Sequence, residues 1–302
     1  MTNETNADPL ARRDDNPVAD TGTFLLGGDL PVRRLGFGAM RLPGPGVWGE
    51  PTDPDAARAV LRRAIDLGMN LIDTADFYGP EVANRLIAET LHPYPDDLVI
   101  ATKVGFVRGA DRSWQAAARP ERLRAAVEDN LRHLRLDHLE LVYLRLGGEG
   151  YPSVAEVPLA ESLGALADLR AAGTIRHIGI SNVTTAQLAA ARELVPIAAV
   201  TNRYNLADRA GEAVLAAAVA AGIAFVPYNP LAIGALAREG GPLAEIARRH
   251  AVAPAQIALA WLLARSPAML LIPGTTSVAH LEENARAATL HLTAAEIAAL
   301  AG

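Results

Sequence analysis

Cysteine is absent from the 302 residues of this chain. Its absence excludes disulfides, thiolate nucleophiles and cysteine-ligated metals, and it fits a reducing compartment, so we expect a cytoplasmic protein. Long apolar runs are missing as well, since charged residues interrupt them before the roughly 20 residues that a membrane helix needs. Residues 1–20 are polar and have no apolar segment typical of a secretory signal. We therefore expect no membrane partner.

Lysine is almost absent too. Of the 28 basic residues, 27 are arginine, and only Lys103 is lysine. A coding bias towards arginine would spare lysine where a guanidinium cannot replace it, because lysine shifts its pKa or forms a Schiff base. Lys103 is thus a candidate functional residue, with chance survival as the alternative. The net charge of −6, with basic residues scattered among acidic ones, argues against a nucleic-acid partner and favours small-molecule chemistry.

What the chain does contain is a repeating alternation of short apolar runs and amphipathic helical patterns. Residues 1–22 are polar, and we expect them to be a disordered tail. Residues 23–302 should form one domain. It begins with a β-hairpin around Gly27, Gly28 and Asp29. The expected strands are 35–38, 70–73, 98–103, 140–144, 177–180, 198–201, 224–227 and 269–272. The expected helices are 53–68, 81–91, 119–134, 158–173, 185–195, 210–222 and 254–266, with a further short helix over 242–252.

Eight strand–helix repeats predict the α/β class and a (β/α)8 TIM barrel with an N-terminal β-hairpin. A doubly wound sheet is less consistent with the sequence, because no early strand is followed by the G-x-G-x-x-G dinucleotide fingerprint. Barrels of this kind carry their active site at the carboxyl ends of the strands. The fold should therefore collect the residues that end the eight strands around one opening.

Three of these strand-end residues suggest proton transfer. Lys103 ends an apolar strand, so its ammonium should be partly desolvated and should pair with a carboxylate, for which Asp73 on the preceding strand is the natural partner. Tyr78 follows five residues after Asp73. A cation beside a phenol favours the phenolate, so we expect the pKa of Tyr78 below its free value of about 10, as suits a general acid–base. Separately, Asp73 could be a turn cap and Tyr78 a packed loop residue.

The order of these motifs resembles the aldo-keto reductases from about Leu35 to the C-terminus. The matching segments are the D-x-A-x-x-Y stretch Asp73 to Tyr78, Lys103 ending the third strand, Ser181-Asn182 after the fifth, Tyr228 to Leu231 after the seventh, and Ile272 to Ser277 with Glu283-Asn284 after the eighth. Each motif is weak alone, but five in register along a βα repeat are specific.

The resemblance implies an NADPH-dependent reductase, with NADH also possible, acting on a small carbonyl substrate. Tyr78 would donate a proton to the carbonyl oxygen, tuned by Lys103 and Asp73. Ser181 and Asn182 would hold the nicotinamide carboxamide, and Tyr228 would stack on its ring. The remaining implied cofactor residues are Gly38 and Met40, the pyrophosphate loop residues Asn229, Leu231 and Gly234, the loop Pro273, Gly274, Thr275 and Ser277, and Glu283 and Asn284 near the adenine.

Three positions depart from the family pattern. The fourth catalytic residue is usually a histidine ending the fourth strand, but Arg145 stands there. We predict that Arg145 stabilises developing oxyanion charge or binds a polar or anionic substrate group; the alternative is an ion pair that only shapes the pocket. Thr201, followed by Asn202, replaces the glutamine common beside the nicotinamide. His280 replaces the arginine that often pairs with the 2′-phosphate, which weakens the case for NADPH over NADH.

Segments such as PGPGVWGEP and VYLRLGG resemble the pyridoxal reductase-like branch of the family, which suggests a pyridoxal-like aromatic aldehyde as substrate. Trp48 and Trp114 lie in βα loops where they could line an aromatic pocket or simply anchor the loops.

Two rival functions stay open at this point: a Schiff-base aldolase-type barrel using Lys103 as nucleophile, and a non-enzymatic barrel that binds NADPH as a sensor or regulatory subunit. A metal hydrolase is disfavoured, since no paired histidine motif ends a strand, and we expect no metal. The sequence leaves the oligomeric state open.

Overall fold

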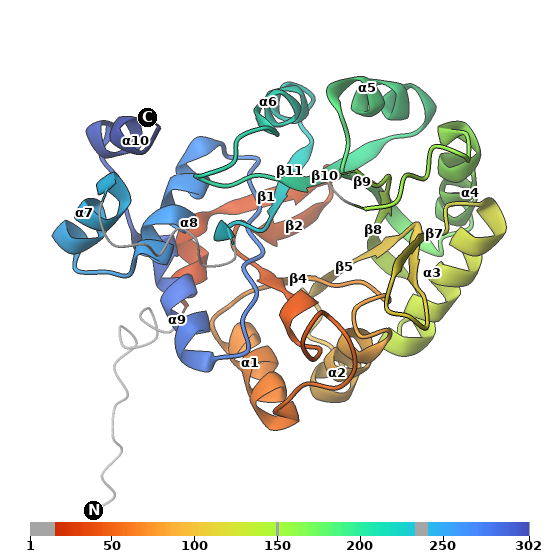
Figure 1. The fold of residues 1–302 in the computed structure, drawn as a ribbon, viewed down its shortest axis with the longest axis horizontal. Helices are drawn as coiled ribbons and strands as arrows, with labels where there is room; N and C mark the ends of the chain where they lie inside the picture. The colour runs from red at the N-terminus through yellow and green to blue at the C-terminus, as the bar shows by residue number, and fades with distance from the viewer. Residues whose placement is uncertain (1–15, 149–150, 233–240, 302) are drawn as a thin grey trace, which may run out of the picture.

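The computed structural model describes residues 16–148, 151–232 and 241–301. Within these ranges, seven parallel strands form a curled sheet in the order β11-β10-β9-β8-β5-β4-β3 (Figure 1). Their bounds are β3 Phe37–Gly38, β4 Leu71–Asp73, β5 Val99–Val104, β8 Leu139–Arg145, β9 Ile175–Ser181, β10 Ile197–Arg203 and β11 Ala224–Tyr228. These strands are buried on both faces, which is why they appear in the sequence as continuous apolar runs.

The eighth predicted strand, 269–272, closes the barrel through isolated parallel bridges rather than a full ladder. Leu271 pairs with Leu35 on one side and Met269 pairs with Phe225 on the other. The Gly36 backbone N–H donates to the Leu271 carbonyl at 2.7 Å, and the Leu270 N–H donates to the Phe225 carbonyl at 2.9 Å. The (β/α)8 barrel predicted from the sequence is therefore confirmed.

Two glycines allow this seam to close. A Cβ on Gly36 would lie 2.4 Å from the Leu71 carbonyl oxygen, and one on Gly38 would lie 2.4 Å from the Ile272 carbonyl oxygen. Both neighbours are backbone atoms and cannot rotate away, so any larger residue would push β3 away from β4 or from the closing segment.

Helices surround the sheet (Figure 1). They are α1 Pro54–Asp66, α2 Val82–Leu91, α3 Pro120–Leu134, α4 Leu159–Ala171, α5 Thr185–Leu194, α6 Glu212–Ala220, α7 Gly241–His250, α8 Pro254–Arg265, α9 Val278–Arg286 and α10 Ala294–Ala301, with short 3-10 helices η2 Ala39–Arg41 and η4 Ala287–Thr289. The expected start signal is confirmed at α1, where the Asp53 carboxylate accepts from the N–H of Ala56 at 3.0 Å. Gly68, Gly173 and Gly222 follow α1, α4 and α6 with φ of 83°, 79° and 67°, as the predicted stops require.

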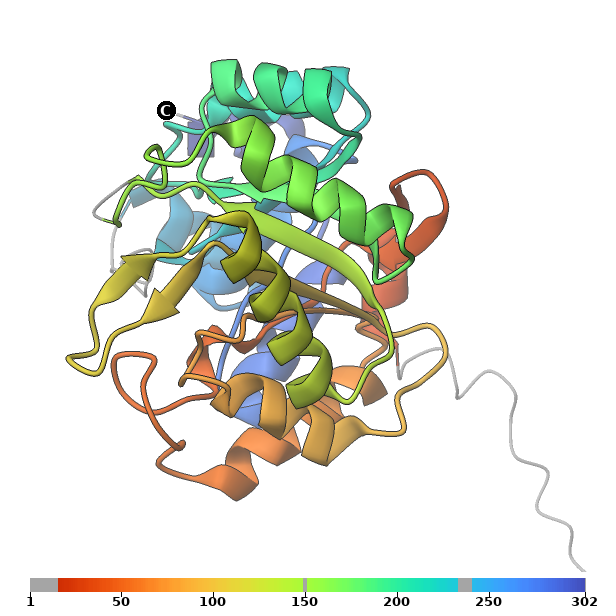
Figure 2. The same cartoon turned by 90° about the vertical axis from the view of Figure 1, so that its right-hand side faces the viewer.

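The predicted N-terminal hairpin is confirmed as β1 Thr23–Leu26 and β2 Leu30–Arg33, and it plugs the amino-terminal end of the barrel. Leu26, Leu30 and Val32 share one buried cluster with strand residues such as Tyr143. The hairpin β6 Phe106–Arg108 and β7 Trp114–Ala116 lies at the opposite end, as Figure 2 shows. The carboxyl ends of the strands are therefore surrounded by the βα loops and not by the N-terminal hairpin.

Part of the predicted disordered tail is ordered. Pro17–Thr21 form the 3-10 helix η1, and Val18 is fully buried. The Thr21 hydroxyl accepts from the backbone N–H of Arg34 at 3.1 Å. The sequence did not predict this 3-10 helix, because Val18 is the only apolar side chain of Pro17–Thr21 that is buried in an otherwise polar segment. The rest of that prediction, residues 1–15, lies outside the described residues. Across the described ranges, no helix is long and apolar enough to cross a membrane.

Candidate active site

Asp73 and Lys103 form a buried ion pair at the ends of the adjacent strands β4 and β5, as the sequence predicts. The Lys103 Nζ also donates to the Thr74 carbonyl oxygen at 3.0 Å. Burial lowers the pKa of Lys103, but Asp73 and Tyr78 together raise it by more, so the pKa of Lys103 lies above its ordinary value. Lys103 is therefore an ammonium at neutral pH.

Tyr78 lies beside this pair, with the Lys103 Nζ 5.1 Å from the centroid of its ring. The expectation of a lowered Tyr78 pKa is wrong in direction. Burial raises the pKa of Tyr78 above its ordinary value, and the charges of Lys103 and Arg145 offset only part of that effect. The sequence showed the cation but not the depth of the burial. Tyr78 is consequently a neutral phenol, which can donate a proton but not readily accept one.

Arg145 ends β8 and is only 6% exposed. Its Nε and Nη2 atoms have no hydrogen-bond partner, and among the described residues no acidic side chain forms an ion pair with it. Its Cζ lies 4.1 Å from the centroid of the Tyr151 ring, 5.6 Å from that of Phe106 and 5.9 Å from that of Tyr228. The alternative that Arg145 is occupied by an ion pair finds no support in the described part of the chain.

Unpartnered polar atoms concentrate around this opening. Of the nine buried side-chain nitrogen and oxygen atoms without a hydrogen-bond partner in the described ranges, seven belong to Asp73, Arg145, Ser181, Asn182 and Thr201. Leaving such a group unsatisfied costs about 1–3 kcal/mol, so their gathering at one place indicates a site for a polar ligand. Ser181 and Thr201 are register partners on β9 and β10.

The Ser181 and Asn182 side chains together offer donors and acceptors that match a carboxamide, as the resemblance implied. Asn182 has a φ of 59°, and its N–H donates to the Thr201 carbonyl at 3.0 Å, which holds it at the strand end. Asn202 is not available in the same way, because its side chain bonds both the N–H and the carbonyl of Val183, at 3.0 and 2.7 Å. The residues present fit a nicotinamide group.

A cavity of about 610 Å³ adjoins the barrel seam and brings together Met40, Gly274 and Thr275. Gly38 is beside it, since its N–H donates to the Pro273 carbonyl at 3.3 Å. Ser277 caps α9 by accepting from the backbone N–H of His280, whose side chain is exposed. The first turn of α9 therefore offers N–H groups and a hydroxyl, but no guanidinium at position 280.

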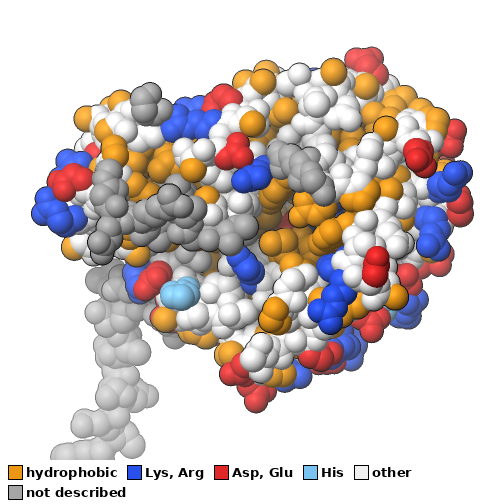
Figure 3. Space-filling view, in the orientation of Figure 1, with side chains coloured by type: hydrophobic (Ala, Val, Ile, Leu, Met, Phe, Trp, Pro, Cys, Tyr) orange, Lys and Arg blue, Asp and Glu red, His pale blue; other side chains and the backbone are white. Residues whose placement is uncertain are grey.

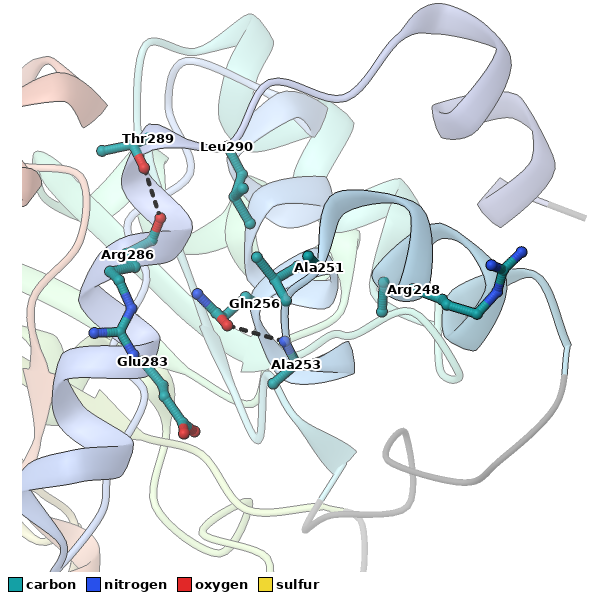
Figure 4. Close-up of a pocket in the computed structure, with 10 residues that line it drawn as sticks. Arg248, Ala251, Ala253, Gln256, Glu283, Arg286, Thr289 and Leu290 are labelled. Carbon is teal, nitrogen blue, oxygen red and sulfur yellow. Dashed lines mark hydrogen bonds between the residues drawn. The ribbon is translucent and has the colours of Figure 1, made fainter.

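A second cavity, of about 650 Å³, lies between α9 and the α7–α8 pair and is lined by Glu283, Arg286 and Arg248 among others (Figure 4). Asn284 is buried next to Glu283 and does not line it. Asn229, with a φ of 56°, and the half-buried Leu231 follow β11 and Tyr228. Gly234, which we expected in the pyrophosphate loop, lies outside the described residues.

Trp48 and Trp114 both contact Arg108, a residue that the sequence did not indicate. The Arg108 Cζ lies 5.1 Å from the Trp48 ring centroid and 4.3 Å from that of Trp114. Trp114 continues edge-to-face to Phe77 at 5.5 Å and to Tyr151 at 5.4 Å, measured between ring centroids. Figure 3 shows a hollow over the barrel centre bordered by hydrophobic side chains. Phe106 and Tyr151 were also missed, although both occupy βα loops after strands that end in site residues.

Comparison with known proteins agrees with this geometry. The sequence model of the Aldo/keto reductase family matches residues 34–302. Pyridoxine 4-dehydrogenase of Escherichia coli is 50% identical over 93% of this chain and 98% of its own length. An uncharacterized oxidoreductase of Schizosaccharomyces pombe is 42% identical over 94% of this chain and 90% of its own. An aldo-keto reductase of Klebsiella pneumoniae in complex with NADPH superposes with a TM-score of 0.78 at 27% identity, over 92% of this chain and 93% of that one. The chain belongs to the aldo/keto reductase family and is an oxidoreductase.

Proposed function

We propose that this enzyme reduces a pyridoxal-like aromatic aldehyde to the corresponding alcohol, with Tyr78 as the proton donor. The observation that carries the proposal is the buried contact of Tyr78 with the Asp73–Lys103 ion pair at the carboxyl ends of the strands. A neutral phenol beside a fixed ammonium is suited to give up a proton, because the cation stabilises the phenolate that forms.

NADPH, when bound, supplies the hydride that reduces the carbonyl carbon and is itself oxidised to NADP+. The C=O π electrons pass to the oxygen, which takes the phenolic proton of Tyr78. The resulting phenolate is held by the Lys103 ammonium until solvent returns the proton. Asp73 keeps Lys103 charged and, with the Thr74 carbonyl, fixes its position. Ser181, Asn182 and Thr201 would hold the carboxamide of the cofactor, and Tyr228 would contact its ring.

Two observations support an aromatic substrate. The rings of Phe77, Phe106, Trp114 and Tyr151 form a continuous edge-to-face cluster that reaches Tyr78, whose ring centroid lies 5.4 Å from that of Phe77. Such a cluster favours flat aryl groups. The second is the 50% identical relative, whose name indicates pyridoxine as its substrate.

The Schiff-base alternative is weaker in this geometry. A nucleophilic lysine must be a neutral amine, whereas Asp73 and Tyr78 together offset burial and hold the pKa of Lys103 above its ordinary value. The sensor alternative requires cofactor binding without turnover on any carbonyl, and the following experiment tests it directly.

NADPH oxidation is measured with pyridoxal, benzaldehyde and an aliphatic aldehyde, in the wild type and in Tyr78→Phe. We expect turnover with the aromatic aldehydes and a fall of about 10²- to 10⁴-fold in kcat for Tyr78→Phe, the contribution typical of a general acid. Tyr94→Phe is the matched control, because the Tyr94 hydroxyl donates to the Leu134 carbonyl at 2.6 Å, away from the site. Undiminished turnover in Tyr78→Phe would refute the proton-donor role, and NADPH binding without any turnover would favour the sensor.

We also propose a cytoplasmic location, which rests on the cysteine-free composition. Cell fractionation with an antibody to the chain tests it.

A further inference from the structure

Arg145 is a buried cation whose hydrogen-bonding capacity is unused on one side. Its two unpartnered atoms, Nε and Nη2, lie on the same edge of the guanidinium group. The N–H bonds of that edge are parallel, which suits two oxygen atoms held side by side. A buried guanidinium without hydrogen bonds is costly, so this edge is built to receive a ligand.

Three aromatic rings lie near the Arg145 guanidinium, and none of them accepts a hydrogen bond from Nε or Nη2. The Tyr151 ring is nearest, with its centroid 4.1 Å from Cζ, and the Phe106 and Tyr228 rings follow at 5.6 and 5.9 Å. Ring faces attract the cation through their quadrupole and accept no in-plane hydrogen bond from it. The guanidinium is therefore held in place, and its orientation is retained for a substrate.

The charge balance of the pocket points to the sign of the ligand. The Lys103 ammonium is neutralised by the Asp73 carboxylate in direct contact. Arg145 has no such partner among the described residues. Asp73, Lys103 and Arg145 together therefore carry one positive charge in excess, and a substrate with one negative charge close to its carbonyl group would balance the charge of these three described residues.

The aromatic cluster indicates where that negative charge sits. It runs from Tyr78 through Phe77 and Trp114 to Tyr151, the ring that stacks on Arg145. An aryl ring whose aldehyde oxygen meets Tyr78 would border this cluster. Because Arg145 is close enough to Tyr78 for its charge to act on the phenol, we assign the substituent adjacent to the aldehyde to Arg145.

We propose that Arg145 is a specificity-determining residue that binds the oxygen pair of an aryl aldehyde carrying an oxyanion ortho to its carbonyl group. The proposal rests on the proposed function and narrows its substrate class: pyridoxal has this arrangement, and so does 2-hydroxybenzaldehyde. Ionised 4-hydroxybenzaldehyde carries the same charge, but its phenolate oxygen is para to the aldehyde. The guanidinium edge cannot bind that oxygen and the carbonyl oxygen together.

Steady-state kinetics with these two isomers give the first test. We expect the wild type to prefer 2-hydroxybenzaldehyde over 4-hydroxybenzaldehyde by about 10- to 100-fold in kcat/KM, the usual range for hydrogen bonds to a charged group. In Arg145→Gln the ratio should fall towards one, mainly through KM. The wild-type preference should grow with pH as the ortho phenol ionises, and this pH dependence should vanish in the variant. Arg124→Gln is the control, because Arg124 pairs with Asp168 on the exposed surface.

A binding measurement separates this proposal from the proposed function. At a pH below the pKa of free 2-hydroxybenzaldehyde, binding at Arg145 should stabilise the phenolate and produce its long-wavelength absorbance, with NADP+ present so that no turnover occurs. Arg145→Gln should show no such band. A band without turnover under NADPH would refute the reductase but keep the ortho-oxyanion site. The proposal would be overturned by equal rates for both isomers, by a ratio unchanged in Arg145→Gln, or by the absence of the phenolate band in the wild type. It would also be overturned if phenylglyoxylate, a keto acid whose anionic group is a carboxylate, were preferred over 2-hydroxybenzaldehyde and the preference depended on Arg145.

Discussion

The Lys103 Nζ lies 5.1 Å from the centroid of the Tyr78 ring while it is held by the Asp73 carboxylate and the Thr74 carbonyl. One cation thus connects the end of β5 to the loop that follows β4. Its position beside the phenol requires the carboxylate, because an unpaired buried ammonium would lose its proton.

The Asp73–Lys103 pair should serve catalysis more than stability. Lys103→Met leaves the carboxylate buried and unpaired, so we expect the free energy of unfolding to fall by about 3–5 kcal/mol, measured by urea denaturation. The double variant Asp73→Asn with Lys103→Met should recover most of that loss and yet keep kcat at least about 100-fold below wild type. Recovery of activity together with stability would contradict the role given to Lys103.

The pH dependence should differ between the two reaction directions. Burial raises the pKa of Tyr78, so the phenol keeps its proton through neutral pH and loses it only above about 10. Aldehyde reduction, which needs the phenol, should therefore be flat from neutral pH and fall only above that value. Alcohol oxidation, which needs the phenolate, should rise with pH over the same range. Profiles of kcat in both directions test this, and a Tyr78-dependent fall in reduction between pH 7 and 9 would argue against it.

The hairpin at the amino-terminal end should affect stability and not turnover. A Cβ on Gly27 would lie 2.1 Å from the His177 Cε1 atom, and His177 is held by Asp29 at 2.7 Å. Gly27→Ala should lower the free energy of unfolding by about 1–3 kcal/mol more than Gly28→Ala, since Gly28 also has positive φ but has open space at its Cβ. Thermal denaturation measures the difference. Equal losses, or a changed kcat, would show that the hairpin does not act as a separate plug.

Arg108 should control substrate affinity. It packs between Trp48 and Trp114, and its Nη1 donates to the Val47 carbonyl at 3.0 Å, so it joins the two loops above the opening. Arg108→Gln should raise KM for aromatic aldehydes about 3- to 30-fold with little change in kcat, consistent with cation–π energies. Arg112→Gln should have a smaller effect, because Arg112 contacts only the Trp48 ring of this pair. A fall in kcat at unchanged KM would contradict this assignment.

The sequence by itself determined the barrel, its hairpin and the identity of the strand-end residues. Eight apolar runs alternate with helical patterns, and in a parallel barrel this alternation fixes which residues end on the same side. For that reason Asp73, Lys103 and Ser181 were predictable as residues around one opening. The stop signals at Gly68 and Gly173 are equally local, since positive φ favours glycine.

Only the tertiary structure decided the properties that depend on what surrounds a residue. The direction of the Tyr78 pKa follows from its burial, which comes from several elements packed together. The free edge of Arg145 and its cover of Phe106, Tyr151 and Tyr228 come from three separate segments of the chain. Periodicity and spacing carry no information on such contacts, because desolvation and hydrogen-bond satisfaction are set by neighbours far apart in sequence.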